Sequence, residues 1–277
     1  MARSAKSERH PSLLETHTPR KRFGQHFLTD KNILEKIARA AQIEPTATVM
    51  EIGPGLGALT RVLSASAAQV VAVEVDRDLA ARLRDEFSNT NVHVLEGDIL
   101  QQPPAAWLAQ AGCAPPYLVV ANLPYYITSA ILRYLLEAPT PPTRLVVMVQ
   151  REVAEQMLAR PPHANLLAVS VQFFGVPRRV AHVPAGAFRP PPQVSSAVVR
   201  IDVHAAPPDI QPSEFFRVVR AGFGAKRKQI HNALANGLGL TRDETTEWLR
   251  RADIEPTRRA ETLQVEEWKR LARTRQS

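Results

Sequence analysis

Cysteine is almost absent from this sequence of 277 residues, because Cys113 is the only one. A single thiol cannot form an internal disulfide, and it cannot supply a zinc site built from several thiolates. Disulfides are also rare in proteins of reducing compartments. We therefore expect a cytoplasmic setting and no metal centre.

Long hydrophobic runs are missing as well. No apolar run approaches the roughly 18 residues that a membrane-spanning helix needs, and residues 1–22 lack the apolar stretch of a secretory signal. We expect a soluble protein that stays where it is made and has no membrane partner. Hydrophobic residues at 44% and aromatic residues at 6% still supply a globular core, and the length predicts one or two domains.

Acidic residues are outnumbered only at the two ends of the chain. Residues 1–22 hold six Lys or Arg against two acids, residues 23–210 hold 15 against 16, and residues 211–277 hold 14 against nine. The net charge of +8 therefore comes from the ends. Basic flanks around a near-neutral middle are typical of a small-ligand domain with polyanion-binding extensions, and a basic surface that is merely solvated is the alternative.

Apolar runs that alternate with helical spacing predict the fold class. Five of these runs are expected to be strands buried on both faces: 48–53, 70–75, 92–97, 117–122 and 144–150. Each is followed by a helical pattern, so we expect right-handed βαβ units and a parallel α/β sheet covered on both sides. Two further strands are expected at 166–175 and 195–204. The short Pro-rich segment between them predicts that the last strand is antiparallel.

The C-terminal part is expected to be helical. Residues 204–213 read as a Pro-punctuated linker, and helical patterns follow it: 214–238, 242–252 and 265–274. We therefore expect three parts along the chain: a basic flexible tail at 1–20, an α/β domain at 21–205 and a small all-helical domain at 206–277.

The segment "EIGPGLGALT" (51–60) follows the first expected strand and opens a helix. Its glycines Gly53, Gly55 and Gly57 let a ligand approach the backbone near a helix N-terminus. A glycine run alone is weak evidence, since a tight strand-to-helix turn also needs glycine. Ala58 completes the G-x-G-x-x-G/A pattern, so a dinucleotide-dependent enzyme is also compatible with these residues.

Two acids stand at the ends of the next two strands. Glu74 lies 21 residues after Gly53, where a carboxylate can accept hydrogen bonds from both ribose hydroxyls. Asp98, in "EGDIL", could accept a hydrogen bond from an adenine amino group, and a helix N-cap is the alternative. Together they favour a cofactor that contains adenosine, without saying which one.

The fourth strand end carries "NLPYYI" (122–127). An exocyclic base amine is a poor nucleophile, because its lone pair is delocalised into the ring. The Asn122 side-chain oxygen and the Leu123 carbonyl could accept hydrogen bonds from this amine. Such hydrogen bonds favour the tetrahedral geometry in which the nitrogen reacts. Pro124 would fix the turn, and Tyr125 offers a face on which a flipped-out base can stack. An Asn-initiated turn beside a core tyrosine is the alternative.

At this point the sequence resembles the KsgA-type rRNA adenine N6,N6-dimethyltransferases over roughly residues 20–265. Seven motifs carry the resemblance: "KRFGQHFLTD" (21–30), "EIGPGLGALT" (51–60), "VEVDRDL" (73–79), "GDIL" (97–100), "NLPYYI" (122–127), "QREVAEQMLA" (150–159) and "FRPPPQVSSAVVR" (188–200). Their order is highly specific and makes the dehydrogenase interpretation remote. The resemblance implies a Rossmann-like, seven-stranded S-adenosylmethionine methyltransferase sheet with a small helical domain.

The resemblance also implies roles for single residues. His26 and Leu28 would cover the cofactor, although many members have Asn at the position of His26. Gly53 would contact the cofactor through its backbone, Glu74 its ribose, Asp98 its adenine and Asn122 its methionyl end. Asn122, Leu123 and Pro124 would form the catalytic segment. The aromatic walls around the flipped adenine would be Tyr125 and Phe188, with a core ring as the alternative for Phe188. The family often has an aromatic–glycine pair where Asn165 and Leu166 stand, and they receive no role.

The segment 214–238 is predicted to be one helix with a basic side and an apolar side. Arg217, Arg220, Arg227 and His231 fall on the basic side, while Phe216, Val219, Phe223 and Ile230 fall on the other. A solvated helix face is the alternative. With the resemblance, the predicted RNA contacts are Arg217, Arg220, Lys226, Arg227 and Lys228.

The resemblance implies a complete activity. The protein would dimethylate N6 of two adjacent adenosines in the 3′-terminal hairpin loop of 16S rRNA, within a pre-30S particle, and act as a monomer. Erm-type methylation of 23S rRNA and a non-catalytic role in ribosome assembly are the alternatives. A protein-glutamine methyltransferase also uses a similar Asn-Pro-Pro-Tyr loop, but the basic helical part argues against it.

Overall fold

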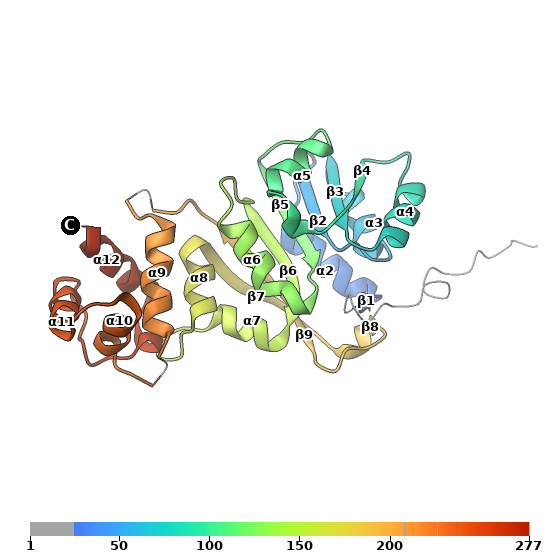
Figure 1. The fold of residues 1–277 in the computed structure, drawn as a ribbon. Helices are drawn as coiled ribbons and strands as arrows, with labels where there is room; N and C mark the ends of the chain where they lie inside the picture. The colour runs from blue at the N-terminus through green and yellow to red at the C-terminus, as the bar shows by residue number, and fades with distance from the viewer. Residues whose placement is uncertain (1–24, 208, 226, 277) are drawn as a thin grey trace, which may run out of the picture.

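The computed structural model describes residues 25–207, 209–225 and 227–276. The expected tail at 1–20 and the predicted RNA contact Lys226 lie outside these residues. Figure 1 shows an elongated molecule, with a sheet and its helices in one part and the C-terminal helices packed at the other end. In the described part of the chain, none of the helices has the length and apolar content to cross a membrane.

The central sheet has seven strands in the order β4-β3-β2-β5-β6-β9-β7. Their bounds are β2 (Thr48–Ile52), β3 (Gln69–Glu74), β4 (Val92–Glu96), β5 (Tyr117–Asn122), β6 (Arg144–Gln150), β7 (Gly175–Val183) and β9 (Ser196–Val203). The strands β2 to β6 pair in parallel. The last strand, β9, lies between β6 and β7 and is antiparallel to both. The predicted mostly parallel sheet with an antiparallel last strand is therefore confirmed.

Helices cover both faces of the sheet. One face packs against α2 (Lys31–Ala41), α3 (Ala58–Ser64) and α4 (Arg77–Glu86). The other packs against α5 (Pro104–Gln110), α6 (Thr128–Leu136), α7 (Arg151–Leu158) and α8 (Leu166–Phe174). Adjacent strand residues supply opposite faces, as the neighbours Val70 and Val71 do, because side chains alternate along a strand. This explains why the central strands are apolar throughout.

Two arginines of the sheet fix the C-terminal end of α2. Arg144 donates from Nη1 to the Ala41 carbonyl at 2.7 Å, and Arg200 donates to the Ala40 carbonyl at 2.8 Å. Asp202 in turn accepts hydrogen bonds from both guanidinium groups. Cations at a helix C-terminus satisfy carbonyls that lack helical partners. These contacts place α2, and with it the segment that precedes it, against β6 and β9.

The prediction of a strand at 166–175 was wrong, because residues 166–174 form α8. The side chain of Asn165 caps this helix by accepting a hydrogen bond from the Ala168 amide at 2.9 Å. Apolar runs without clear periodicity fit a buried helix as well as a buried strand. The strand β7 begins only at Gly175, where the expected strand was to end.

The prediction of one helix over 214–238 was also wrong. The chain forms α9 (Pro212–Phe223) and α10 (Ile230–Leu238), followed by α11 (Arg242–Arg251) and α12 (Val265–Gln276). At the start of α10, the Ile230 amide donates to the Arg258 carbonyl at 2.7 Å instead of to a preceding turn. The imidazole of His231 is only 3% exposed and donates from Nδ1 to the Pro256 carbonyl at 2.6 Å. His231 therefore does not belong to a basic surface.

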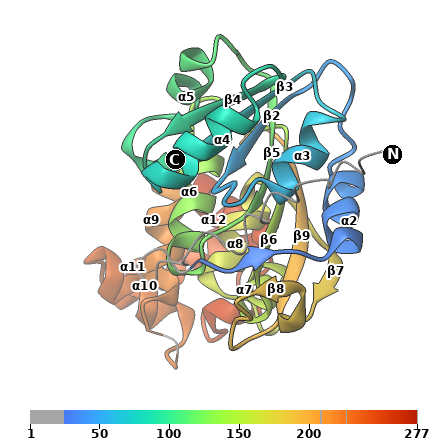
Figure 2. The same cartoon turned by 90° about the vertical axis from the view of Figure 1, so that its right-hand side faces the viewer.

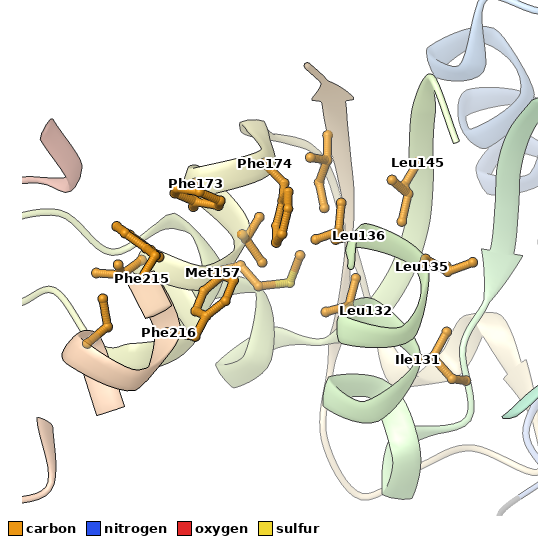
Figure 3. Close-up of a cluster of buried hydrophobic side chains, with 14 of the residues drawn as sticks. Ile131, Leu132, Leu135, Leu136, Leu145, Met157, Phe173, Phe174, Phe215 and Phe216 are labelled. Carbon is orange, nitrogen blue, oxygen red and sulfur yellow. The ribbon is translucent and has the colours of Figure 1, made fainter. Parts of the chain in front are cut away.

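One hydrophobic core runs from the sheet into the C-terminal helices. It continues from β6 and α6 through α8 to α9, as Figure 3 shows for a cluster that includes Met157, Phe173 and Phe215. The rings of Phe173 and Phe215 stack with centroids 4.0 Å apart and planes 24° apart. The helical part is therefore packed directly on the α8 side of the sheet.

This continuous core predicts a large effect of Phe173→Ala. Phe173 is fully buried, and removing such a ring from a core costs about 3–5 kcal/mol of unfolding free energy. The matched control is Val176→Ala on β7, where the side chain is 59% exposed and the change should stay within about 0.5 kcal/mol. Urea unfolding measures both, and a loss below about 1 kcal/mol for Phe173→Ala would contradict the shared core.

Candidate active site

A small cavity of about 100 Å³ lies at the carboxyl ends of β2, β3 and β5. It is lined by the glycine loop after β2, by Glu74 and Val75, by residues 122–126 after β5, and by residues 25–28. A larger cavity of about 860 Å³ lies between α6, α8 and the 3-10 turn η5 (Ala260–Thr262), but none of the predicted cofactor or catalytic residues lines it. Among the described residues, no cluster of His, Cys, Asp or Glu could hold a metal ion.

Residues 25–28 reach the cavity as a short strap. The strand β1 (Phe27–Leu28) pairs antiparallel with β8 (Phe188–Arg189), which follows the 3-10 turn η4 (Ala185–Ala187). Figure 2 shows β1 and β8 side by side below the ends of β2 and β3. Asp30 then caps α2 by accepting from the amides of Asn32 and Ile33. The strap thus brings the predicted residues His26 and Leu28 to the cavity.

The glycine loop adopts backbone angles that favour glycine. Gly53 has φ of +67° and Gly55 has φ of +60°, which is the left-handed region that other residues rarely enter. A methyl group added at Gly53 would meet no atom within 4 Å, so this position faces open space. The Gly55 amide donates to Glu74 Oε2 at 3.0 Å. The loop therefore joins two of the predicted cofactor contacts.

Glu74 ends β3 with its carboxylate inside the site. Its side chain is 4% exposed, and Oε1 accepts from the Asp76 amide at 2.9 Å. Burial raises the pKa of Glu74, while the amides of Asp76 and Gly55 act in the opposite direction. A carboxylate offers about four acceptor positions, so the two backbone donors leave capacity for two ligand hydroxyls.

Glu51 lines the cavity, although the sequence prediction gave it no role. Its side chain is 1% exposed, and Oε2 has no hydrogen-bond partner among the described residues. Burial raises the pKa of Glu51 from 4.5 to about 8; the nearby Thr60 hydroxyl opposes this shift and the charge of Glu74 adds to it. The Thr60 hydroxyl and Glu51 Oε2 do not form a hydrogen bond of normal geometry with each other. The position of Glu51 at the end of β2, two residues before Gly53, was the available signal.

Asp98 is placed beside the cavity and does not line it. It caps the 3-10 turn η2 (Ile99–Gln101) by accepting from the Leu100 amide at 3.0 Å, which is the alternative that the sequence left open. The exposed Tyr126 does line the cavity, and its pKa is raised by burial and then by the charges of Asp98 and Glu74. The predicted contact of Asp98 with adenine stays a prediction.

Asn122 is the last residue of β5, and its amide is held in one orientation. Nδ2 donates to the His26 carbonyl oxygen at 3.2 Å. A carbonyl can only accept, so the amide nitrogen must face His26. The Asn122 side-chain oxygen is therefore directed away from the strap and can accept hydrogen bonds from a ligand.

The residues after Asn122 form a fixed turn. The Leu123 amide donates to the Met148 carbonyl at 3.1 Å, and the Pro124 carbonyl accepts from the Thr128 hydroxyl at 3.0 Å as the turn η3 (Tyr125–Ile127) leads into α6. The Tyr125 hydroxyl shares a 2.6 Å hydrogen bond with Ser196. Burial raises the pKa of Tyr125, and the Ser196 contact lowers it. Tyr125 is thus a neutral ring with an anchored edge.

Phe188 does not line the cavity. It pairs with Leu28 in the small sheet, is 1% exposed and belongs to the core on the α2 side of the main sheet. This placement is the core-ring alternative, since β8 turns the side chain inward. The structure therefore brings together His26, Leu28, Gly53, Glu74, Asn122, Leu123, Pro124 and Tyr125, and it leaves Phe188 and Asp98 outside the cavity.

The comparison with protein families gives one match over nearly the whole chain. Residues 16–276 match the family described as "Ribosomal RNA adenine dimethylase". The chain is 49% identical over 264 residues to "Ribosomal RNA small subunit methyltransferase A" of Dehalococcoides mccartyi. This alignment covers 94% of this chain and 90% of that protein. A protein of the same name from Moorella thermoacetica is 46% identical over 268 residues, with 93% of each chain covered.

Two solved structures are similar along most of the chain. A dimethyladenosine transferase from Plasmodium falciparum superposes with a TM-score of 0.75 at 25% identity, covering 89% of this chain and 96% of that one. The 23S rRNA methyltransferase ErmE superposes with a TM-score of 0.71 at 29% identity, covering 91% and 100%. These similarities confirm the predicted Rossmann-like methyltransferase fold with C-terminal helices.

The raised pKa of Glu51 predicts a pH-dependent stability. Between pH 4.5 and about 8, the folded protein keeps a proton on Glu51 that the unfolded chain has lost. The free energy of unfolding should therefore fall as pH rises through this window, by up to about 1.4 kcal/mol per pH unit from this group. Glu51→Gln should flatten the profile and stabilise the protein most at pH 8. Denaturant unfolding at pH 5 and pH 8 measures this, and identical slopes for both proteins would refute a neutral Glu51.

Proposed function

Because the chain belongs to the ribosomal RNA adenine dimethylase family, we propose that it methylates N6 of two adjacent adenosines in the 3′-terminal hairpin loop of 16S rRNA. The product is N6,N6-dimethyladenosine, and the acceptor is a partly assembled 30S subunit. The enzyme acts in the cytoplasm as a monomer. Residues 21–205 form the methyltransferase domain and residues 206–277 the RNA-binding domain. The names of the relatives at 46–49% identity support the small subunit as the source of the RNA.

The orientation of Asn122 is the observation that carries this proposal. The side-chain oxygen of Asn122 and the Leu123 carbonyl accept the two hydrogens of the target amine, which favours the tetrahedral geometry that a nucleophilic nitrogen needs. The His26 carbonyl holds the Asn122 amide so that its oxygen is available. The face of Tyr125 supports a base that has left its stack. The proton released after methylation passes to water, so the site needs no strong base.

The lining of the cavity suits S-adenosylmethionine as the methyl donor. This cofactor carries its reactive methyl group on a sulfonium and therefore brings positive charge. The described residues that line the cavity include the carboxyls of Glu51 and Glu74 and no Lys or Arg, so the site suits a cation. Gly53 faces open space for the cofactor, Glu74 accepts from its ribose hydroxyls, and His26 and Leu28 cover it from the strap. Asp98, which lies beside the cavity, would accept a hydrogen bond from its adenine amino group.

Methylation of 23S rRNA is the second candidate, because ErmE shares the fold at 29% identity. The relatives named for the small subunit share much higher identity and cover at least 90% of both chains. A non-catalytic assembly factor is disfavoured, since Asn122, Tyr125 and the glycine loop are all held in the site. The choice between the two ribosomal subunits therefore rests on the relatives and needs a direct assay.

We expect the pure protein to add up to four methyl groups to each immature small subunit, all on adenine N6. The test incubates it with labelled S-adenosylmethionine and subunits from cells that lack the gene, and then digests the RNA to nucleosides. Mature 30S subunits, whose target adenosines are already methylated, and isolated 50S subunits are the controls. Label found only in large-subunit RNA, or monomethyladenosine as the sole end product, would overturn the proposal.

The RNA surface is proposed to lie on α9 and on the turn that follows it. Arg217 and Arg220 are exposed on α9, and Arg227 and Lys228 are exposed in the connection to α10. Arg217 also forms an ion pair with Glu214 at 2.8 Å. The four described residues are proposed to form one basic patch around the end of α9, which the phosphates of a folded RNA can follow.

The double variant Arg220→Glu and Arg227→Glu should lower RNA affinity and flatten its salt dependence. Each lost phosphate contact reduces the slope of log affinity against log salt by about 0.7 on single strands. The matched control is Lys36→Glu with Arg39→Glu on α2, which makes the same charge change on another exposed helix. Titration of immature subunits at several salt concentrations measures both variants. Equal behaviour of the two would reduce the patch to an ordinary solvated surface.

A further inference from the structure

Two carboxyls line the cavity, and the fold treats them differently. Glu51 near the end of β2 is 1% exposed, and Glu74 at the end of the neighbouring strand β3 is 4% exposed. Both oxygens of Glu74 accept hydrogen bonds from backbone amides, whereas Oε2 of Glu51 has no hydrogen-bond partner among the described residues. Hydrogen bonds to a carboxylate favour its charged form. The fold therefore supports Glu74 as an anion and withholds this support from Glu51.

The rest of the cavity lining does not supply a Lys or Arg to pair with Glu51, as far as the described residues extend. The titratable side chains that share the lining with it come from the strap, from β3 and from the turn after β5: His26, Glu74, Tyr125 and Tyr126. Burial raises the pKa of both tyrosines, so they are uncharged at neutral pH.

The neighbouring elements do not neutralise Glu51 either. Asp76, which follows β3, is fully buried and adds a further carboxyl to this region. On α3, the Thr60 hydroxyl lies near Glu51, and the guanidinium of Arg61 pairs with Glu86 at 2.6 Å. Burial raises the pKa of Glu51 from 4.5 to about 8. The carboxyl is therefore mostly neutral at pH 7 as long as no cation lies close to it.

The methyl donor and its product differ in charge. S-adenosylmethionine carries a positive sulfonium, and S-adenosylhomocysteine, which remains after methyl transfer, has a neutral thioether in its place. A cation near a buried carboxyl favours the ionised form of the carboxyl, whereas burial by a neutral ligand favours the protonated form. The protonation state of Glu51 is therefore expected to differ between the two complexes.

We propose that Glu51 is a specificity-determining residue, which releases its proton when S-adenosylmethionine binds and regains a proton from solvent when S-adenosylhomocysteine remains. The ionised carboxyl attracts the cationic donor, and the neutral carboxyl exerts no such attraction on the product. Glu51 thus favours the exchange of product for fresh donor. This role rests on the proposed function, in which one site transfers several methyl groups and must exchange its cofactor each time.

Proton release on binding tests this role with the full-length protein. Calorimetry at pH 7 in two buffers of different ionisation enthalpy measures the protons that each ligand releases. The wild type should release roughly one proton with S-adenosylmethionine and a much smaller fraction with S-adenosylhomocysteine. Glu51→Gln keeps the shape of the neutral side chain and cannot ionise, so this difference between the two ligands should disappear.

The same proton makes the affinity for the methyl donor depend on pH. From pH 6 to pH 7.5, the wild-type dissociation constant for S-adenosylmethionine should fall by up to about ten-fold per pH unit, because ionising Glu51 becomes easier. The constant for S-adenosylhomocysteine should change by less than about two-fold. Glu51→Gln should flatten the first profile and weaken donor binding most at pH 7.5. His26→Asn, which removes the imidazole of the strap, is the matched control and should keep the wild-type pH dependence.

Several results would overturn the role of Glu51. Equal proton release with the two ligands in the wild type would show that the carboxyl does not respond to the sulfonium. A pH dependence that survives in Glu51→Gln and is lost in His26→Asn would assign the proton to His26. An unchanged ratio of the two dissociation constants in Glu51→Gln would remove its part in specificity. These results leave the proposed function intact, whereas a wild type that binds neither ligand would refute the function and this role together.

Discussion

The strands β3, β2 and β5 are parallel neighbours in the sheet, so their carboxyl ends meet at one edge. This adjacency places Glu74, the glycine loop and Asn122 around one cavity, although they come from three separate parts of the chain. Ligands of open parallel sheets bind at such edges. The antiparallel β9 adds Ser196, whose hydroxyl anchors Tyr125. If the order of these strands were different, the motifs would not form one site.

The strap at residues 25–28 supplies a further wall of the cavity. It holds the Asn122 amide through the His26 carbonyl and closes the cavity from the side that the strands leave open. The strap is itself positioned by β8 and by α2, whose far end is bound by Arg144 and Arg200. All residues that line the cavity lie between Gln25 and Tyr126, so the site is built within the sheet part of the molecule.

The site also carries an energetic cost. Glu51 and Glu74 are buried close together in a cavity that has no basic residue among its described lining. Burying carboxyls without a cation disfavours their charged form, and a cationic ligand would relieve this. Functional sites commonly conflict with stability in this way, and the rest of the fold compensates. Here the compensation is the continuous core that joins β6, α8 and α9.

Local signals in the sequence predicted most of the fold and much of the site. Six of the seven expected strands were correct because apolar, β-branched runs marked them. The residues Asn122 to Tyr125, which were singled out for their own chemistry, line the cavity. The segment 166–174 was predicted to be a strand because its apolar run has no clear period. The N-terminal cap by Asn165 favours the helix that forms there instead. The helix break before Ile230 depends on Arg258, which is distant in sequence. The contact between His26 and Asn122 joins residues 96 positions apart, and no local pattern could show it.

The central claim is that Asn122 acts on the amine and not merely on the cofactor. The most direct test compares Asn122→Ala with Glu74→Ala, using single-turnover methylation of immature small subunits and calorimetric binding of S-adenosylmethionine. Glu74→Ala should weaken binding by roughly 1.5–3 kcal/mol for each charge-assisted hydrogen bond lost, and saturating cofactor should restore most of its rate. Asn122→Ala should remain slower by on the order of 100-fold at saturating cofactor. A near-normal rate for Asn122→Ala under those conditions would contradict the account.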